Sequence, residues 1–113
     1  MKLPSEAFLL RIFIGESDKA GRKPLYQAIV EEARRREMAG ATVLRGFLGF
    51  GANSRIHTTK VLRISTDLPV VVEIVDEQDK IEALLPVLDQ MIGEGLVTLE
   101  KVKVITYRPG DAE

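Results

Sequence analysis

The sequence contains no cysteine and no tryptophan, and its only histidine is His57. The lack of thiols excludes disulfides, thiol catalysis and thiolate metal sites. Aromatic residues make up 5% of the chain, so few side chains are available to stack on nucleic acid bases. The formal net charge is −1, whereas proteins that bind nucleic acid through charge are normally strongly basic. We therefore expect no nucleic acid partner.

Long apolar runs are also absent. No stretch approaches the roughly 18 apolar residues of a membrane span. Glu6 and Arg11 interrupt the region in which a signal peptide needs an apolar core. A chain of 113 residues fits one domain, so we expect a single domain over residues 1–113 and a cytoplasmic location.

The hydrophobic pattern predicts two helices and several strands. Pro24 is placed to begin a helix that ends at Gly40, and Asp76 is placed to cap a second helix that ends at residues 93–95. Pro86 lies inside the second helix and is expected to kink or split it. Alternation of apolar residues predicts strands at 8–14, 42–50, 70–75 and 97–105, the last with a bulge at Glu100–Lys101, and a further extended segment at 60–65 that returns antiparallel to 42–50.

This order of elements, β-α-β-β-α-β, predicts an α+β fold of the ferredoxin-like kind, with two helices on one face of an antiparallel sheet. The uncovered face would carry apolar side chains from the first, third and last strands. Because monomers rarely expose such a patch, we expect a homo-oligomer in which the sheets face one another.

The segment RGFLGFGANSRIHTTK, residues 45–60, holds three glycines and no helix signal after them. It matches neither the Walker phosphate loop nor the dinucleotide fingerprint, which both lead directly into a helix. One interpretation is that the glycines only bend the end of a strand. The other is that Gly49 and Gly51 bring backbone N–H groups close to a phosphate or a base.

Other candidate residues have ordinary structural interpretations too. His57 in a polar loop is typical of a solvated side chain, and no acidic partner or ligand spacing marks a catalytic triad or a metal site. Arg108 follows the last strand beside a Pro-Gly turn, where its guanidinium would suit a phosphate or simply face solvent. Glu73 interrupts an apolar strand and needs a donor, which a ligand, a partner subunit or a cross-strand Lys or Arg would supply.

Several spaced motifs together resemble PII signalling proteins, and more closely the uncharacterised PII-like family known as domain of unknown function 190. The motifs are GATV followed by RGFLGFG, the long polar loop, VVVEIVD, and GEGLVT before the last strand. The resemblance implies a homotrimer that binds adenine nucleotides in clefts between subunits, has no catalytic residues, and uses a loop at about residues 52–59 to control a partner. A membrane channel or transporter is the expected kind of partner.

The resemblance also implies which residues meet the nucleotide. Gly49-Phe50-Gly51 would open the long loop, and Thr42 would meet the base from a neighbouring subunit. Glu73 and Val75 would approach the adenine and ribose. The remaining residues implied for the phosphates are the loop Gly93, Glu94, Gly95 and Leu96, then Arg108, with Arg55 and His57 as further contacts from the long loop.

Two departures from the PII pattern affect the expected ligand. Leu96 stands where PII proteins place a phosphate-binding lysine, and Thr106 replaces an arginine. Losing two charged contacts would weaken triphosphate binding by several kcal/mol, at about 1.5–3 kcal/mol each. We therefore expect AMP or ADP rather than ATP, and no cofactor or metal.

Three alternatives remain. An RNA-binding module has the same strand order but needs exposed aromatics on its central strands, which 70–75 lacks. A trimeric metal-binding or metal-tolerance protein would have to manage with one histidine and no cysteine. A ligand-free structural subunit would use Gly49 and Gly51 only to shape the strand end.

Overall fold

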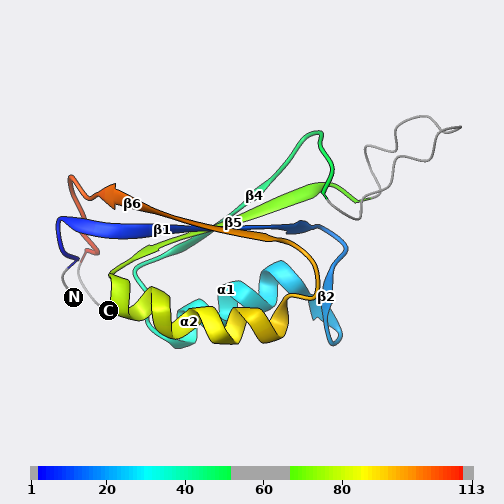
Figure 1. Ribbon diagram of the computed structural model, residues 1–113, viewed down its shortest axis with the longest axis horizontal. Helices are drawn as coiled ribbons and strands as arrows, with labels where there is room; N and C mark the ends of the chain where they lie inside the picture. Colours follow the sequence, from blue (N-terminus) through cyan, green and yellow to red (C-terminus); the bar gives the residue numbers. More distant parts are fainter. Residues whose placement is uncertain (1–2, 52–66, 111–113) are drawn as a thin grey trace, which may run out of the picture.

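The computed structural model describes residues 3–51 and 67–110. The strands are β1 (Glu6–Gly15), β2 (Lys19–Ala20), β3 (Lys23–Pro24), β4 (Ala41–Arg45), β5 (Pro69–Asp76) and β6 (Leu96–Lys103), and the helices are α1 (Leu25–Arg35) and α2 (Gln78–Met91). Antiparallel pairing places four strands in the order β4-β5-β1-β6, and both helices lie on one face of this sheet (Figure 1). The predicted ferredoxin-like fold is therefore confirmed. The extended segment predicted at 60–65 lies outside the described residues.

The core lies between the sheet and the two helices. Alternate residues of the central strands β1 and β5 point toward the helices, as the pleat of a strand requires. Helix α2 contributes a stripe of apolar side chains, of which Leu85 and Ile92 are partly buried. The fully or nearly fully buried side chains are Leu10, Ile12, Ile14, Val70, Val72, Ile74, Leu25, Ile29, Ala33, Ile81, Leu84 and Leu88.

Strand β4 ends at Arg45, five residues before the predicted end at Phe50. Its partner β5 begins at Pro69, so β5 offers no residue for the positions after Gly46 to pair with. The Gly46 N–H donates to the Pro69 carbonyl at 2.6 Å, which closes the pairing. A Cβ on Gly46 would lie 2.6 Å from Pro69 Cγ, so only glycine fits there. The chain thus leaves the sheet where proline and glycine pack together.

Helix α1 ends at Arg35 and not at Gly40 as predicted. Glu37 adopts the left-handed conformation (φ 57°) that glycine usually supplies, and Met38 N–H donates back to the Ala33 carbonyl. This is the hydrogen bonding of a Schellman turn. Tertiary contacts fix the exit, because Lys80 Nζ donates to the Glu37 carbonyl at 2.9 Å.

Asp76 does not cap α2, which corrects a second prediction. The residue closes β5, is fully buried, and its carboxylate accepts hydrogen bonds from Ala39 N–H at 2.8 Å and Glu77 N–H at 2.7 Å. Helix α2 begins at Gln78, and its N-cap residue, Glu77, makes no side-chain capping hydrogen bond. Asp76 therefore joins the exit of α1 to the entry of α2.

The bulge predicted in the last strand is also wrong. Strand β6 pairs with β1 in one continuous register, from Phe13↔Leu96 to Glu6↔Lys103. The apolar pattern that suggested a bulge arises because β6 places Val97 and Leu99 on the helix side of the sheet and Val102 on the other side, which an edge strand tolerates.

Pro86 does not split α2, which continues from Gln78 to Met91. Leu84 and Leu88 are buried on either side of Pro86 and hold both halves of the helix on the sheet.

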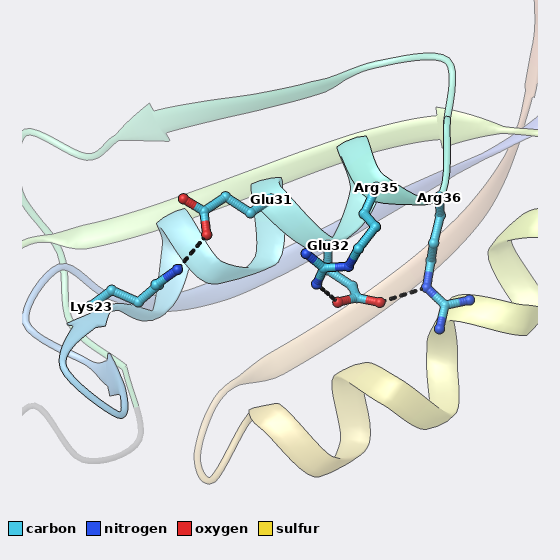
Figure 2. Close-up of polar contacts among 5 residues, drawn as sticks. All are labelled: Lys23, Glu31, Glu32, Arg35 and Arg36. Atoms are coloured by element: carbon cyan, nitrogen blue, oxygen red, sulfur yellow. Dashed lines mark hydrogen bonds and ion pairs between the residues drawn. The ribbon is translucent and has the colours of Figure 1, made fainter.

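Charged side chains cover the outer surface of α1. Glu32 forms ion pairs with Arg35 and with Arg36, the latter at 2.8 Å, and Glu31 pairs with Lys23 at 2.6 Å (Figure 2). Hydrogen bonds from the two arginines lower the pKa of Glu32 below its usual value. None of the helices in the described parts of the chain is both long and apolar enough to cross a bilayer.

Candidate functional site

A pocket of about 460 Å³ lies at the end of the sheet from which β4 departs. Four chain segments meet there: the end of β1, the residues after β4, the start of β5, and the loop between α2 and β6. Its lining residues are Phe13, Ile14, Gly15, Asp18, Phe50, Gly51, Asp67, Pro69, Glu94, Gly95 and Leu96.

The pocket brings together five of the residues that the sequence predicted to bind nucleotide. Phe50 and Gly51 come from the segment after β4, and Glu94, Gly95 and Leu96 come from the loop before β6. These two loops are far apart in the chain, and only the antiparallel pairing of the sheet places them at one end. Phe50 is 70% exposed, so the fold itself does not use its ring as core.

The glycines of this region divide into two kinds. Gly49, like Gly46, packs against Pro69, with a hypothetical Cβ 3.1 Å from Pro69 Cγ. Gly51 has no described residue within 4 Å of a hypothetical Cβ, although it lines the pocket. The strand-end interpretation therefore accounts for Gly46 and Gly49, and leaves Gly51 without a packing role.

Gly95 is required by close packing with β1. A Cβ there would lie 2.8 Å from the Phe13 carbonyl oxygen, so a side chain would push the loop away from the sheet. Gly93 has open space around it and lines a neighbouring groove rather than the pocket. The loop before β6 is thus fixed at Gly95 and open at Gly93.

Carboxylates supply the charge of the pocket. Asp67 Oδ1 accepts hydrogen bonds from Ser17 N–H at 3.1 Å and Ser17 Oγ at 2.9 Å, and Asp18 Oδ2 accepts from Gly15 N–H at 2.9 Å. Glu94 completes the acidic set, and none of the described lining residues is basic. With Phe13, Phe50 and Leu96 as apolar walls, the pocket suits a flat ring whose hydroxyl or amino groups donate hydrogen bonds. Sequence analysis missed Asp18 and Asp67, although both stand in turn-forming segments.

Thr42, Glu73 and Val75 lie on the open face of the sheet and do not line this pocket. Thr42 pairs with Glu73 across β4 and β5, and Glu73 pairs with Arg11 of β1. These residues are two positions along the strands from Phe13, about 7 Å at the rise of an antiparallel strand. Val75 lies two positions further from the pocket. These three candidate residues therefore lie on the open face, at increasing distance from the pocket along the strands.

Arg11 is the donor that Glu73 needs. Its Nε lies 2.9 Å from Glu73 Oε2, and its Nη1 lies 2.8 Å from Glu100 Oε1. The hydrogen bond that Arg11 donates to Glu73 is the largest cause of the raised Arg11 pKa, so the guanidinium stays charged. Of the donors considered for Glu73, the structure shows a cross-strand arginine. The sequence alone did not predict Arg11 as the partner of Glu73, because that pairing depends on the strand register.

Arg108 is exposed and follows β6 at the opposite end of the sheet from the pocket, because β6 runs from Leu96 beside Phe13 to Lys103 beside Glu6 (Figure 1). Its neighbour Tyr107 donates a hydrogen bond to the Ala39 carbonyl at 3.4 Å, close to the start of β4. Arg55 and His57 lie outside the described residues. No cluster of three or more His, Cys, Asp or Glu side chains in residues 3–51 and 67–110 is arranged to hold a metal.

Comparison with known proteins gives family and fold. The family model DUF190, described as "Uncharacterized ACR", matches residues 7–104. A UPF0166 protein of Aquifex aeolicus is 42% identical over 99 residues, which cover 86% of this chain and 91% of that protein. A UPF0166 protein of Methanocaldococcus jannaschii is 33% identical over 95 residues, covering 83% of this chain and 87% of the relative.

Among solved structures, the fold is similar to that of CPII from Thiomonas intermedia K12, described as a nitrogen regulatory PII-like protein. The CPII complex with ADP and bicarbonate has a TM-score of 0.56 and 17% identity, over 96% of this chain and 94% of CPII. The complex with ADP, AMP and acetate also has a TM-score of 0.56, with 14% identity over 92% of each chain. At these identities the likeness shows the PII-like fold.

Proposed function

We propose that this chain, which belongs to the DUF190 family of uncharacterised proteins, is a PII-like regulatory protein that binds AMP or ADP between subunits and is not an enzyme. One observation carries the proposal: Phe50, Gly51 and Glu94–Leu96, expected to bind nucleotide, meet in one pocket. Among the described residues Gly51 has open space around it, so packing against them does not account for its lack of a side chain.

Two chains complete the site in this proposal. Thr42, Val75 and Arg108 lie along the open face or at the far end of the sheet, and one chain cannot bring them to its own pocket. A neighbouring chain whose open face packs against this one supplies them. A homotrimer with three equivalent seams satisfies this requirement by rotation about a single axis.

The charge of the pocket supports a nucleotide with few phosphates. Asp18, Asp67 and Glu94 repel an anion, and Leu96 offers no cation to offset them. The apolar walls and carboxylates suit the base and the ribose hydroxyls, and Arg108 of a neighbouring chain then meets the phosphate. The CPII structures, which hold ADP and AMP, support an adenine nucleotide as the ligand class.

The proposal also includes a regulatory role, which involves residues beyond the pocket. Bound nucleotide changes the conformation of the segment after Gly51, and that segment selects a partner, which we propose to be a membrane channel or transporter in contact with the cytoplasm. This is an order–disorder switch of the kind that nucleotides control in other signalling proteins.

Calorimetric titration of AMP, ADP and ATP, with light scattering to give the oligomeric state, tests the proposal. We expect trimers, and tighter binding of AMP or ADP than of ATP. Absence of heat and of a thermal shift with all three nucleotides would favour the ligand-free structural alternative. Metal analysis of the purified protein separates the metal-binding alternative, and unchanged nucleotide after prolonged incubation is expected of a protein that is not an enzyme.

Three variants in one segment separate ligand contact from fold. Gly51→Val should lower nucleotide affinity about tenfold or more while the melting temperature is kept, because its Cβ meets no atom of residues 3–51 and 67–110. Gly46→Val should lower the melting temperature, because its side chain would collide with Pro69. Leu48→Val, at an exposed position that does not line the pocket, is the control and should change neither property.

A further inference from the structure

A groove of about 610 Å³ separates α2 from β6 on the helix-covered side of the sheet. Its apolar surface includes Leu85, Leu88 and Ile92 of the α2 segment and Val97 of β6. Strand β6 is an edge strand, and its helix-side residues Val97 and Leu99 remain 40% and 46% exposed. Helix α2 buries Ile81 and Leu84 in the core but leaves Val97 and Leu99 of β6 partly exposed.

Acidic side chains border the same groove. Glu82 and Asp89 are seven residues apart on α2, so they lie on one face of the helix two turns apart. Glu82 accepts a hydrogen bond from the neutral amide of Gln78 at 2.9 Å. Asp89 has no hydrogen bond or ion pair among the described residues. The α2 side of the groove therefore carries negative charge that no cation of the described chain offsets.

We propose that this groove binds a short segment of a partner protein that combines apolar and basic side chains. Apolar side chains would cover Val97 and the flank of α2, where exposed apolar area stabilises association. A lysine or arginine would meet Asp89 or Glu82, and this charge complementarity distinguishes the segment from a purely apolar one.

The groove shares a wall with the nucleotide pocket. Gly93 and Gly95 line the groove, while Glu94 and Gly95 line the pocket, so the two sides of one loop face the two sites. A ligand that shifts this loop changes the shape of both. The coupling between the sites rests on the proposed nucleotide function, whereas binding of the segment to the groove does not.

The test uses a fluorescein-labelled octapeptide of alternating leucine and lysine, titrated into the full chain and followed by fluorescence polarisation. Matched peptides replace every lysine with glutamate or every leucine with serine. We expect the leucine–lysine peptide to bind at least fivefold more tightly than either control, and amide NMR shifts to centre on α2 and β6. Equal binding of the leucine–glutamate peptide, or shifts centred on the open face of the sheet, would overturn the proposal.

Two adjacent lysine substitutions check the role of charge. Asp89→Lys should weaken binding of the leucine–lysine peptide by about fivefold or more, consistent with reversing one exposed ion pair. Gln90→Lys, exposed on the next position of α2 and outside the groove, should leave it nearly unchanged. Equal losses in both variants would contradict a specific contact, and self-association through the groove without peptide would assign it to a second copy of the chain instead.

Repeating the peptide titration with AMP or ADP at saturation tests the coupling. We expect peptide affinity to change at least threefold, and nucleotide affinity to change by the same factor when peptide is present. Peptide binding in a protein that binds no nucleotide would support the groove and contradict the proposed nucleotide function. Binding of both ligands with unchanged affinities would overturn the coupling alone.

Discussion

The two faces of the central sheet are built from the same strands but differ in the burial and polarity of their side chains. On the helix-covered face, Leu10, Ile12, Val72 and Ile74 are fully buried and apolar. On the open face the alternate residues are mixed, and the ion pairs of Arg11 lie between Phe13 and Leu9. One face holds the chain together, while the other presents a surface with both apolar area and fixed charges.

The open face carries the expected apolar side chains and, in addition, a group of paired charges. Arg11, with Glu73 and Glu100, divides the patch into two apolar parts, one toward the pocket and one toward the end of β6. Charge pairs of this kind fix the register of an interface more than they strengthen it. We therefore expect the open face to select a partner arrangement and not merely to attract apolar surface.

The largest difference between the faces should appear when adjacent leucines are shortened. Leu10→Ala removes a fully buried side chain and should lower the free energy of unfolding by about 2–5 kcal/mol. Leu9→Ala changes the same residue type on the open face, where the side chain is only partly buried, and should cost clearly less. Urea denaturation of dilute protein measures both, and equal losses would show that the open face is as much a core as the covered one.

A smaller loss of stability is expected when the buried carboxylate at the end of β5 is removed. Asp76→Ala removes a buried acceptor and leaves the Ala39 and Glu77 N–H groups without their partner, which should cost about 1–3 kcal/mol. Asp79→Ala, at an exposed position in the first turn of α2, is the matched control. Thermal unfolding should separate the two, and a neutral Asp76→Ala would show that water replaces the lost acceptor.

Removing the charge from the centre of the open face should affect association more than folding. Arg11→Met leaves Glu73 and Glu100 without their shared cation, and Glu73→Gln removes one of the two carboxylates. We expect each to change unfolding less than Asp76→Ala, because the groups are solvent-accessible, and to alter the oligomer distribution seen by light scattering. A double-mutant cycle that shows additive effects would mean that the pair is not coupled.

The sequence predicted the fold class because its strongest patterns concern burial. The apolar residues of 70–75 predicted a strand, and the apolar pattern after Asp76 predicted a helix; both are confirmed. The errors lie where tertiary contacts decide. Met38 and Lys80 fix the end of α1 before Gly40, and Pro69 ends β4 before Phe50.

The candidate site was predictable only in part, for a geometric reason. Glycine-rich loops are visible in the sequence, so Gly51 and the loop before β6 were found. Which glycines pack against Pro69 and which remain open depends on the pairing of β4 with β5. The partner of Glu73 and the acidic lining from Asp18 and Asp67 likewise depend on register and loop closure, which local sequence does not encode.

The smallest effect on stability is expected from the ion pairs on the outer surface of α1. These pairs repeat the Arg–Glu chemistry of the open face, but they lie away from the expected subunit contact. Hydrogen bonds from Arg36 and Arg35 lower the Glu32 pKa below its usual 4.5. The folded state therefore binds a proton at Glu32 less readily than the unfolded state does. The stabilisation is present above the unfolded pKa and is lost as the pH falls through the lower folded pKa.

Glu32→Gln should accordingly reduce stability slightly at neutral pH and flatten its decline below about pH 4.5, the range in which Glu32 titrates. Urea midpoints measured between neutral pH and strongly acidic pH give the difference between the variant and the parent chain. The oligomer distribution should stay the same, in contrast to Arg11→Met, because these pairs lie on the helix layer (Figure 2). A loss of assembly in Glu32→Gln as large as that in Arg11→Met would remove the distinction between the two surfaces, and with it the argument that the open face forms the subunit contact.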